Sequence, residues 1–193
     1  MTERKGQRTR AAIVATTAGL LRRQGYAATG LNQIVEQAKA PKGSLYFHFP
    51  GGKDELVASA LGEAADAWRD ALLAAISDET DLGRAIARAG ELLASELETS
   101  GYLHGCPLAT VTLEAAATNP TVQRVVSDHY RVLEDIIAER VIAAGIPADR
   151  ARPLALLVLS SLEGALVLAR AHHDAGIVRR IAAQLASLVQ PRR

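Results

Sequence analysis

Residues 29–56, TGLNQIVEQAKAPKGSLYFHFPGGKDEL, constrain the fold more than any other stretch, because they predict two short helices separated by a tight turn. Thr29 suits the N-cap of the first helix. Lys39-Ala40-Pro41 suits the turn, and Pro41 fits the start of a second helix over residues 42–48, where its missing N–H is tolerated. Proline and glycine at 50–52 end that helix before a third begins at Lys53.

Helices are expected along the whole chain. Apolar residues recur at helical spacing, as at Ile13, Leu20 and Leu21, whereas the alternation typical of strands is hard to find. A composition of 49% hydrophobic and only 4% aromatic residues, rich in Ala and Leu, also favours helix. Besides the helix after Thr29, we predict helices over residues 7–24, 42–48, 53–76, 82–99, 107–118, 120–144, 148–173 and 176–189.

The predicted fold class is therefore all-α. A three-helix helix-turn-helix domain is expected at residues 1–52, and a domain of roughly six helices at residues 53–193. The charge is unevenly distributed as well. Residues 1–56 carry nine Lys or Arg against four acids, a net +5, while the remainder carries thirteen against seventeen, a net −4. A basic front end on an acidic body indicates a polyanion-binding module joined to something else.

The sequence also bears on the compartment. The single cysteine, Cys106, excludes an internal disulfide framework. No apolar segment follows the charged N-terminus, so no signal peptide is expected. The longest apolar run, residues 154–169, is interrupted by Glu163 and is shorter than the roughly 20 residues of a membrane span. We expect a cytoplasmic protein without membrane attachment.

The helix predicted after the turn carries groups that suit double-stranded DNA. A helix-turn-helix places its second helix in the major groove, with the first residues of that helix facing base edges. Lys42 can reach guanine acceptors or a phosphate, and Ser44 can bond several base edges. Gly43 between them lets the backbone approach the DNA closely.

The aromatic residues of this helix strengthen the interpretation. Leu45 and Phe49, four residues apart, form its inward face, which leaves Tyr46, Phe47 and His48 on or near the outside. Two exposed aromatic rings and a histidine are unfavourable without a partner. In DNA, the Tyr46 hydroxyl and the His48 ring could bond phosphates, and Phe47 could lie against a thymine methyl. The alternative is that the three side chains pack on the helix starting at Lys53.

Residues 7–56 resemble the TetR family of bacterial transcriptional repressors, through a basic first helix, KGSLYFHF and the helix start KDEL. PGGK and GCPLATVTLEAA, at 105–116, are similar to the branch of LmrA and YxaF regulators. The resemblance implies an all-helical homodimer that binds an operator and is released by a small molecule. Carried over by position, the DNA contacts are Thr29, Lys42, Gly43, Ser44, Tyr46, Phe47, His48 and Lys53.

One position departs from the family pattern. Lys39 stands where many members have glycine, in the turn between the two short helices. A left-handed backbone there would be unfavourable for lysine by roughly 1 kcal/mol. Either the turn avoids that conformation or Lys39 accepts the strain.

The resemblance also implies an effector pocket in the larger domain, and an apolar or aromatic compound is the expected ligand. Candidate lining residues are large or polar groups on otherwise apolar helices. A buried Glu163 would need a base such as Arg170, or a pocket to face. The candidates are Trp68, Tyr102, His104, Cys106, Glu114, His129, Tyr130 and Glu163.

Dimerisation is expected through the last two helices. The helix over 148–173 is apolar around its whole circumference, which predicts burial by its own subunit on one side and by a partner on the other. The interface stripe we predict is Leu154, Leu157, Val158, Ser161, Leu162, Ala165 and Leu168, with Ile177, Ile181, Leu185 and Leu188.

Other functions are less well supported by the residues. An enzyme could use Cys106 with His104, but no third group is evident, so we predict no catalytic site. His172 and His173 are neighbours that point about 100° apart on a helix, so no metal site is expected, and no cofactor either. Two alternatives within DNA binding stay open: a thiol sensor acting through Cys106, and a DNA-binding regulator without a small-molecule ligand.

Overall fold

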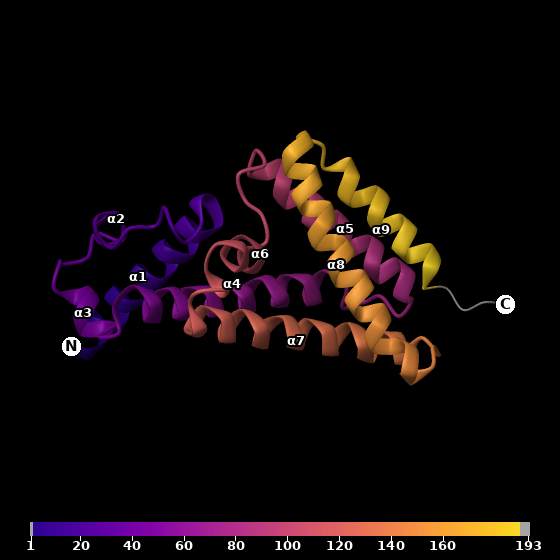
Figure 1. Ribbon diagram of the computed structural model, residues 1–193, viewed down its shortest axis with the longest axis horizontal. Helices are drawn as coiled ribbons and strands as arrows, with labels where there is room; N and C mark the ends of the chain where they lie inside the picture. Colours follow the sequence, from indigo (N-terminus) through magenta and orange to yellow (C-terminus); the bar gives the residue numbers. More distant parts are fainter. Residues whose placement is uncertain (1, 190–193) are drawn as a thin grey trace. The chain divides into compact units, whose positions relative to one another are not determined.

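The computed structural model describes residues 2–189, and every regular element in that range is a helix (Figure 1). The all-α prediction is confirmed. The elements are α1 (Thr2–Gln24), α2 (Leu31–Gln37), α3 (Ser44–His48), α4 (Gly52–Ala75), α5 (Leu82–Thr99), α6 (Pro107–Val111), the π-helical turn η1 (Thr112–Ala116), α7 (Pro120–Ala143), α8 (Ala148–His172) and α9 (Gly176–Leu188).

Most helix bounds follow the glycine and proline breaks, although α1 begins at Thr2 and not at residue 7 as predicted. The uniform helix predicted over 107–118 is wrong, because a short α-helix passes into a π-helical turn at Thr112. The predicted N-cap of α2 is also wrong. Gly30 occupies that position, while Thr29 is fully buried and its hydroxyl donates to the carbonyl of Gly25 at 2.6 Å.

Two compact units make up the described chain. One contains the residues up to Ala67 together with Cys106–His129, and the other contains Trp68–Gly105 and the residues from Tyr130 onward. These units do not follow the domain boundary predicted at residue 52, because the first part of α4 and the segment Cys106–His129 pack with α1–α3. The functional division into residues 1–52 and 53–193 stays a prediction.

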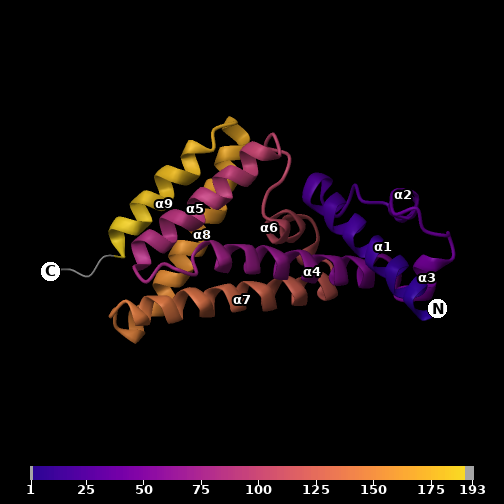
Figure 2. The same ribbon diagram turned by 180° about the vertical axis from the view of Figure 1, so that it is seen from behind.

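The first unit is built on α1. Ile13, Val14 and Leu21 are at most 1% exposed, and α2, α3 and α4 add further side chains to the same core, among them Ile34, Leu45, Phe49, Leu56, Val57 and Leu61. The guanidinium of Arg10 lies 5.2 Å from the centre of the Phe49 ring. In Figure 2, α6 lies beside the C-terminal end of α1. The unit therefore joins the predicted helix-turn-helix to the segment Cys106–His129, which follows α5 in the chain.

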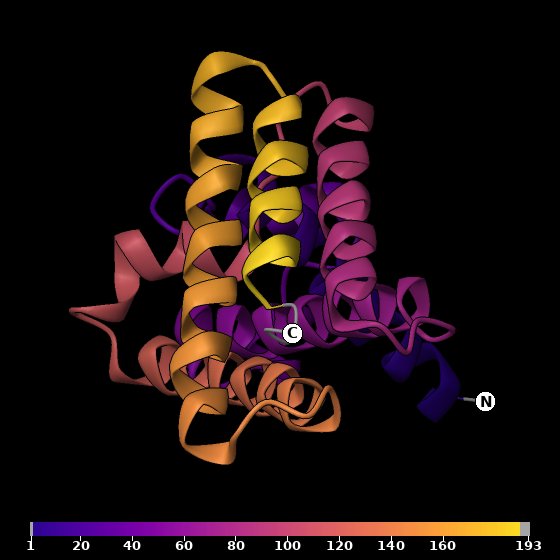
Figure 3. The same ribbon diagram turned by 90° about the vertical axis from the view of Figure 1, so that its right-hand side faces the viewer.

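In the second unit α5, α8 and α9 lie side by side, with α9 between the other two (Figure 3). The core includes Leu82, Ile86, Val158, Ala182 and Leu185. Arg179 of α9 donates to both Glu91 and Glu98 of α5, at 2.8 to 2.9 Å. These hydrogen bonds lower the pKa of both glutamates.

The predicted dimer stripe needs correction. Val158, Ala165 and Leu185 are at most 4% exposed and belong to the subunit's own core, with Leu154, Leu162 and Ile181 packed on it. Ser161 and Ile177 are half-buried. Because α8 is apolar all round, helical periodicity could not tell its inner face from its outer face. The large side chains that lie outward are Leu156, Leu157, Val167, Leu168 and Leu188, 45–64% exposed, of which Leu157, Leu168 and Leu188 were predicted.

Among the described helices, α8 alone is long and apolar enough to cross a membrane by length and composition. That criterion is weak, since core helices of soluble proteins also meet it.

Candidate nucleic-acid interface

The short helix α3 is anchored by two apolar side chains and presents two aromatic ones. Leu45 and Phe49 are each 1% exposed, which confirms their predicted inward orientation. Tyr46 is 63% exposed and Phe47 is 80% exposed. Large rings left open to water on so short a helix indicate a surface that functions with a partner.

His48 differs from its two neighbours. Its ring is half-buried, edge-on to Phe47 at 5.0 Å between ring centres. It also lies near Gly6 of α1, where an added Cβ would be 3.8 Å from His48 Cε1. The alternative of packing within the subunit thus holds in part for His48, against α1 instead of α4.

The turn before α3 adopts the left-handed conformation. Lys39 has φ +50°, so it accepts the strain instead of avoiding it. The N–H of Ala40 donates to the carbonyl of Val35 at 3.0 Å, the closure that ends helices at a left-handed residue. Lys42 and Gly43 follow in the turn and are exposed, so α3 begins two residues later than predicted.

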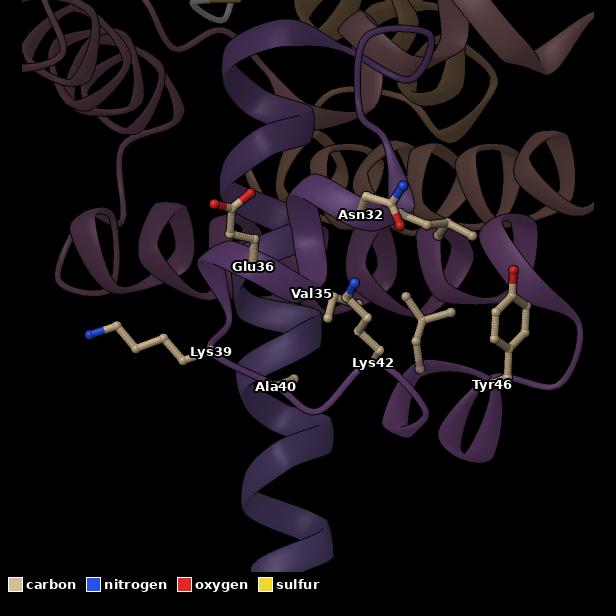
Figure 4. A pocket seen from close by; sticks show the side chains of 9 residues that line it. Asn32, Val35, Glu36, Lys39, Ala40, Lys42 and Tyr46 are labelled. Atoms are coloured by element: carbon tan, nitrogen blue, oxygen red, sulfur yellow. The ribbon is translucent and has the colours of Figure 1, made fainter.

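A hollow of about 670 Å³ lies between α2 and α3 (Figure 4). Lys42 and Tyr46 line it from one side, and Asn32, Glu36 and Lys39 from the side of α2 and the turn. In Figure 4 the Lys42 ammonium and the Tyr46 hydroxyl both point upward in the view. The amide of Asn32, a residue of α2, lies on that side. Sequence reasoning missed Asn32, although a polar side chain early in the first helix of the motif was a usable signal.

Two of the predicted phosphate contacts are engaged inside the subunit. The Lys53 ammonium donates to the carbonyl of Tyr26 at 2.8 Å and lies 4.2 Å from the centre of the Tyr26 ring. Thr29 is buried, as described above, so its hydroxyl is not presented to a phosphate. Both side chains instead hold the turn between α1 and α2.

The predicted effector-pocket residues are divided between the two units. In the first unit Cys106 is buried directly before α6, and His129 has Nδ1 2.8 Å from the Val125 carbonyl and Nε2 3.4 Å from Asp66 Oδ1. Glu114 is exposed, and its carboxylate accepts from the N–H of Ala27 at 2.8 Å. Glu114 therefore binds the subunit's own backbone.

In the second unit, Tyr102 has φ +62°, and its hydroxyl accepts from the N–H of Ala175 at 3.3 Å. Tyr130 donates to Glu163 at 3.5 Å, so Glu163 meets a hydroxyl, whereas Arg170 donates to the carbonyl of Tyr102. Trp68 and His104 are half-buried. Neither unit gathers the eight candidates into one site.

Comparison with known proteins gives one consistent result. Residues 13–60 match the family model of bacterial regulatory proteins of the tetR family, and residues 83–184 match the C-terminal domain of LmrA/YxaF-like transcriptional regulators. A regulator of the helix-turn-helix type from Mycobacterium tuberculosis is 33% identical over 92% of both chains.

Two further relatives agree. The HTH-type transcriptional regulator YxaF of Bacillus subtilis is 30% identical over 92% of this chain and 93% of its own. The crystal structure of a TetR transcriptional regulator from Chloroflexus aurantiacus has 30% sequence identity and a TM-score of 0.82, with 96% of each chain covered. The similarity thus extends over both compact units.

Proposed function

Since the chain belongs to the TetR family of bacterial transcriptional regulators, with an LmrA/YxaF-like C-terminal domain, we propose that it is a repressor that binds a pseudo-palindromic operator as a homodimer and leaves it on binding a small apolar or aromatic compound. The chain is accordingly a regulator and not an enzyme. The observation that carries the proposal is the pair of exposed rings, Tyr46 and Phe47, on a helix anchored by Leu45 and Phe49.

On this proposal, α3 lies in the major groove and its polar start reads bases. Lys42 and Ser44 reach base edges, Gly43 allows the backbone close to the duplex, and Phe47 lies against a thymine methyl. The Tyr46 hydroxyl donates to a phosphate, which sets register without reading sequence. Thr29 and Lys53 are left out of the contact set for the structural reasons given above, and His48 contributes only its exposed edge.

Homodimerisation is supported by the outer face of α8 and α9, which we define as Leu156, Leu157, Val167, Leu168 and Leu188. These five large aliphatic side chains, each about half exposed or more, lie on two helices that contact each other, and exposed apolar surface supports a protein interface. Two recognition helices in a two-fold dimer would bind half-sites about one helical turn of DNA apart.

Two alternatives differ in their support. Cys106 is 5% exposed, which disfavours a thiol sensor, since redox-sensing cysteines are accessible. A regulator without a small-molecule ligand is tested by a thermal-shift screen of apolar compounds. A compound at 100 times its Kd would raise the free energy of unfolding by about 2.7 kcal/mol.

The DNA-binding proposal is tested by selection from a random-sequence duplex library, followed by footprinting. We expect enrichment of an inverted repeat with half-sites about 10 base pairs apart, bound far more tightly than scrambled duplex at the same salt concentration. Equal affinity for selected and scrambled duplexes, with only a steep salt dependence, would identify a non-specific DNA organiser instead.

A further inference from the structure

The turn between α1 and α2, residues 25–29, is hydrogen-bonded to a carboxylate from a distant part of the chain. Glu114 of η1 accepts a hydrogen bond from the backbone N–H of Ala27 at 2.8 Å. Residues 25–29 and 114 both lie in the first compact unit. A bond between an amide and an ionised carboxylate is stronger than one between neutral groups. The turn is therefore tied to η1 by a directional contact in addition to apolar packing.

Gly25 fits the same contact. It has φ +76°, and a Cβ added there would lie 1.8 Å from Oε1 of Glu114. The carboxylate thus occupies the space that a Cβ at position 25 would need, and a side chain there would have to displace it. The left-handed backbone also favours glycine at this position.

Further polar contacts hold Tyr26 in the same turn. Its hydroxyl donates to Asp54 of α4 at 2.6 Å, and Asn119, just before α7, donates to that hydroxyl at 3.5 Å. Burial and then the hydrogen bond to Asp54 raise the pKa of Tyr26, so the phenol stays a proton donor. Together with Lys53, these groups form what we call the turn clamp: Glu114, Asn119, Lys53 and Asp54 around residues 25–29.

The turn clamp bears directly on the helices that meet DNA. The hydroxyl of Thr29 donates to the carbonyl of Gly25, and α2 starts two residues after Thr29. The turn therefore sets the start of α2, which packs with α1 and carries the fully buried Ile34. Glu114 lies in the segment that matches the C-terminal regulatory domain, residues 83–184, yet it packs with the helix-turn-helix.

We infer that Glu114 is a positioning residue for DNA binding, and that the conformation of η1 sets operator affinity through its grip on residues 25–27. This inference rests on the proposed function. Glu114 is exposed and sits on a π-helical turn, a rare conformation that occurs often at functional sites. A state of residues 106–116 that withdraws this carboxylate frees the turn and lowers affinity by a factor within the roughly 5–150-fold range of allosteric couplings.

Four side chains at position 114 separate reach from charge. Gln keeps the acceptor oxygen without the charge, Asp keeps the charge but is one methylene shorter, and Ala has neither. With the duplex that the wild-type protein selects from a random library, we expect Glu114→Gln to bind within about twofold of wild type. Glu114→Asp and Glu114→Ala should bind about fivefold or more weakly.

The sign of the effect is informative, because removing an acidic charge from a DNA-binding protein reduces repulsion and should by itself tighten binding. Glu139→Ala, on the exposed surface of α7, controls for that effect and should bind at least as well as wild type. The inference would be overturned if the affinity followed charge alone, so that Glu114→Asp bound like wild type and Glu114→Gln bound like Glu114→Ala. It would also be overturned if wild type and the three variants bound equally well.

Hydrogen exchange at the Ala27 amide gives a readout that does not depend on DNA. We expect faster exchange in Glu114→Ala and Glu114→Asp than in wild type, with unchanged rates for core amides of α5 in the second unit. Unchanged exchange at Ala27 would show that the grip is absent in solution and would overturn the inference. If the wild-type protein selects no duplex at all, the proposed function fails, whatever the exchange data show.

Discussion

One set of exposed large apolar side chains lies on α3 and another lies on α8 and α9, and their surroundings assign them to different partners. On α3, the exposed rings of Tyr46 and Phe47 stand beside an ammonium and a hydroxyl, at Lys42 and Ser44. On the outer face of α8 and α9 the exposed groups are aliphatic, and exposed Ser160 and Gly164 lie on the same helix. The first surface suits a polyanion with apolar features, and the second suits a copy of itself. Exposure alone marks both as interfaces, but the neighbouring polar groups tell them apart.

The largest expected effect comes from a charge on the aliphatic surface. Leu168 is 50% exposed, so Leu168→Arg should be tolerated within the subunit but should place two like charges close together in a dimer. We expect a monomer by light scattering and a loss of operator affinity of at least about 100-fold, because two half-sites are no longer bound together. Glu139→Arg on α7 is the matched control and should stay dimeric. A dimeric Leu168→Arg with full operator affinity would place the interface elsewhere.

The next effect is confined to α3 and divides its roles. Lys42→Ala should weaken binding to the selected duplex by about 10-fold. It should also reduce the ratio of affinities for the selected and scrambled duplexes, since each good base contact contributes about 1–3 kcal/mol of discrimination. Tyr46→Phe should lower the affinity for both duplexes by a similar factor of about 3–10, because a phosphate contact carries no sequence information. Fluorescence anisotropy at one salt concentration measures both. The assignment is refuted if the two variants behave alike on the two duplexes.

The helix ranges and the orientation of α3 could be predicted from the sequence. The course of the helices was predictable, because glycine and proline stand at nearly every break, and α5 matches its predicted range residue for residue. The orientation of α3 followed from Leu45 and Phe49, four residues apart. Local rules of this kind act over a few neighbouring residues, and the sequence displays them directly.

Features that depend on residues far apart were not predictable. Helical periodicity on α8 could not say which face meets α5 and α9, so Val158 and Ala165 were placed at an interface although they are core. Glu114 looked like a pocket residue because nothing in its own neighbourhood reveals the Ala27 amide, 87 positions away. The π-helical turn that carries Glu114 has no sequence signature that we recognise.

Two glycines offer a finer test of the two surfaces. A Cβ at Gly43 or at Gly164 would meet nothing within 4 Å in the subunit, and neither has a left-handed backbone. Gly164→Ala should therefore stabilise α8 by about 1 kcal/mol against denaturant, while weakening the dimer if helices approach closely there. Gly43→Ala should leave dimerisation unchanged and weaken DNA binding by several-fold, roughly one lost close contact. Full DNA affinity in Gly43→Ala, or a loss of DNA affinity in a Gly164→Ala protein that is still dimeric, would erase the distinction between the surfaces.

The smallest expected effect uses two left-handed residues, one near each surface. Lys39 ends α2 with φ +50°, and His173 ends α8 with φ +51°, each with the same closing hydrogen bond from the residue that follows. Lys39→Gly removes about 1–2 kcal/mol of strain but gains chain entropy in the unfolded state, so a net stabilisation of about 0.5 kcal/mol is expected. His173→Gly should gain less, since the ring also stacks on Tyr102 with 4.9 Å between centres. Only Lys39→Gly removes a cationic side chain next to α3, from a residue that lines the hollow, so it alone should weaken DNA binding and flatten its salt dependence. If Lys39→Gly stabilises the fold without any change in DNA affinity, Lys39 has no role at this interface.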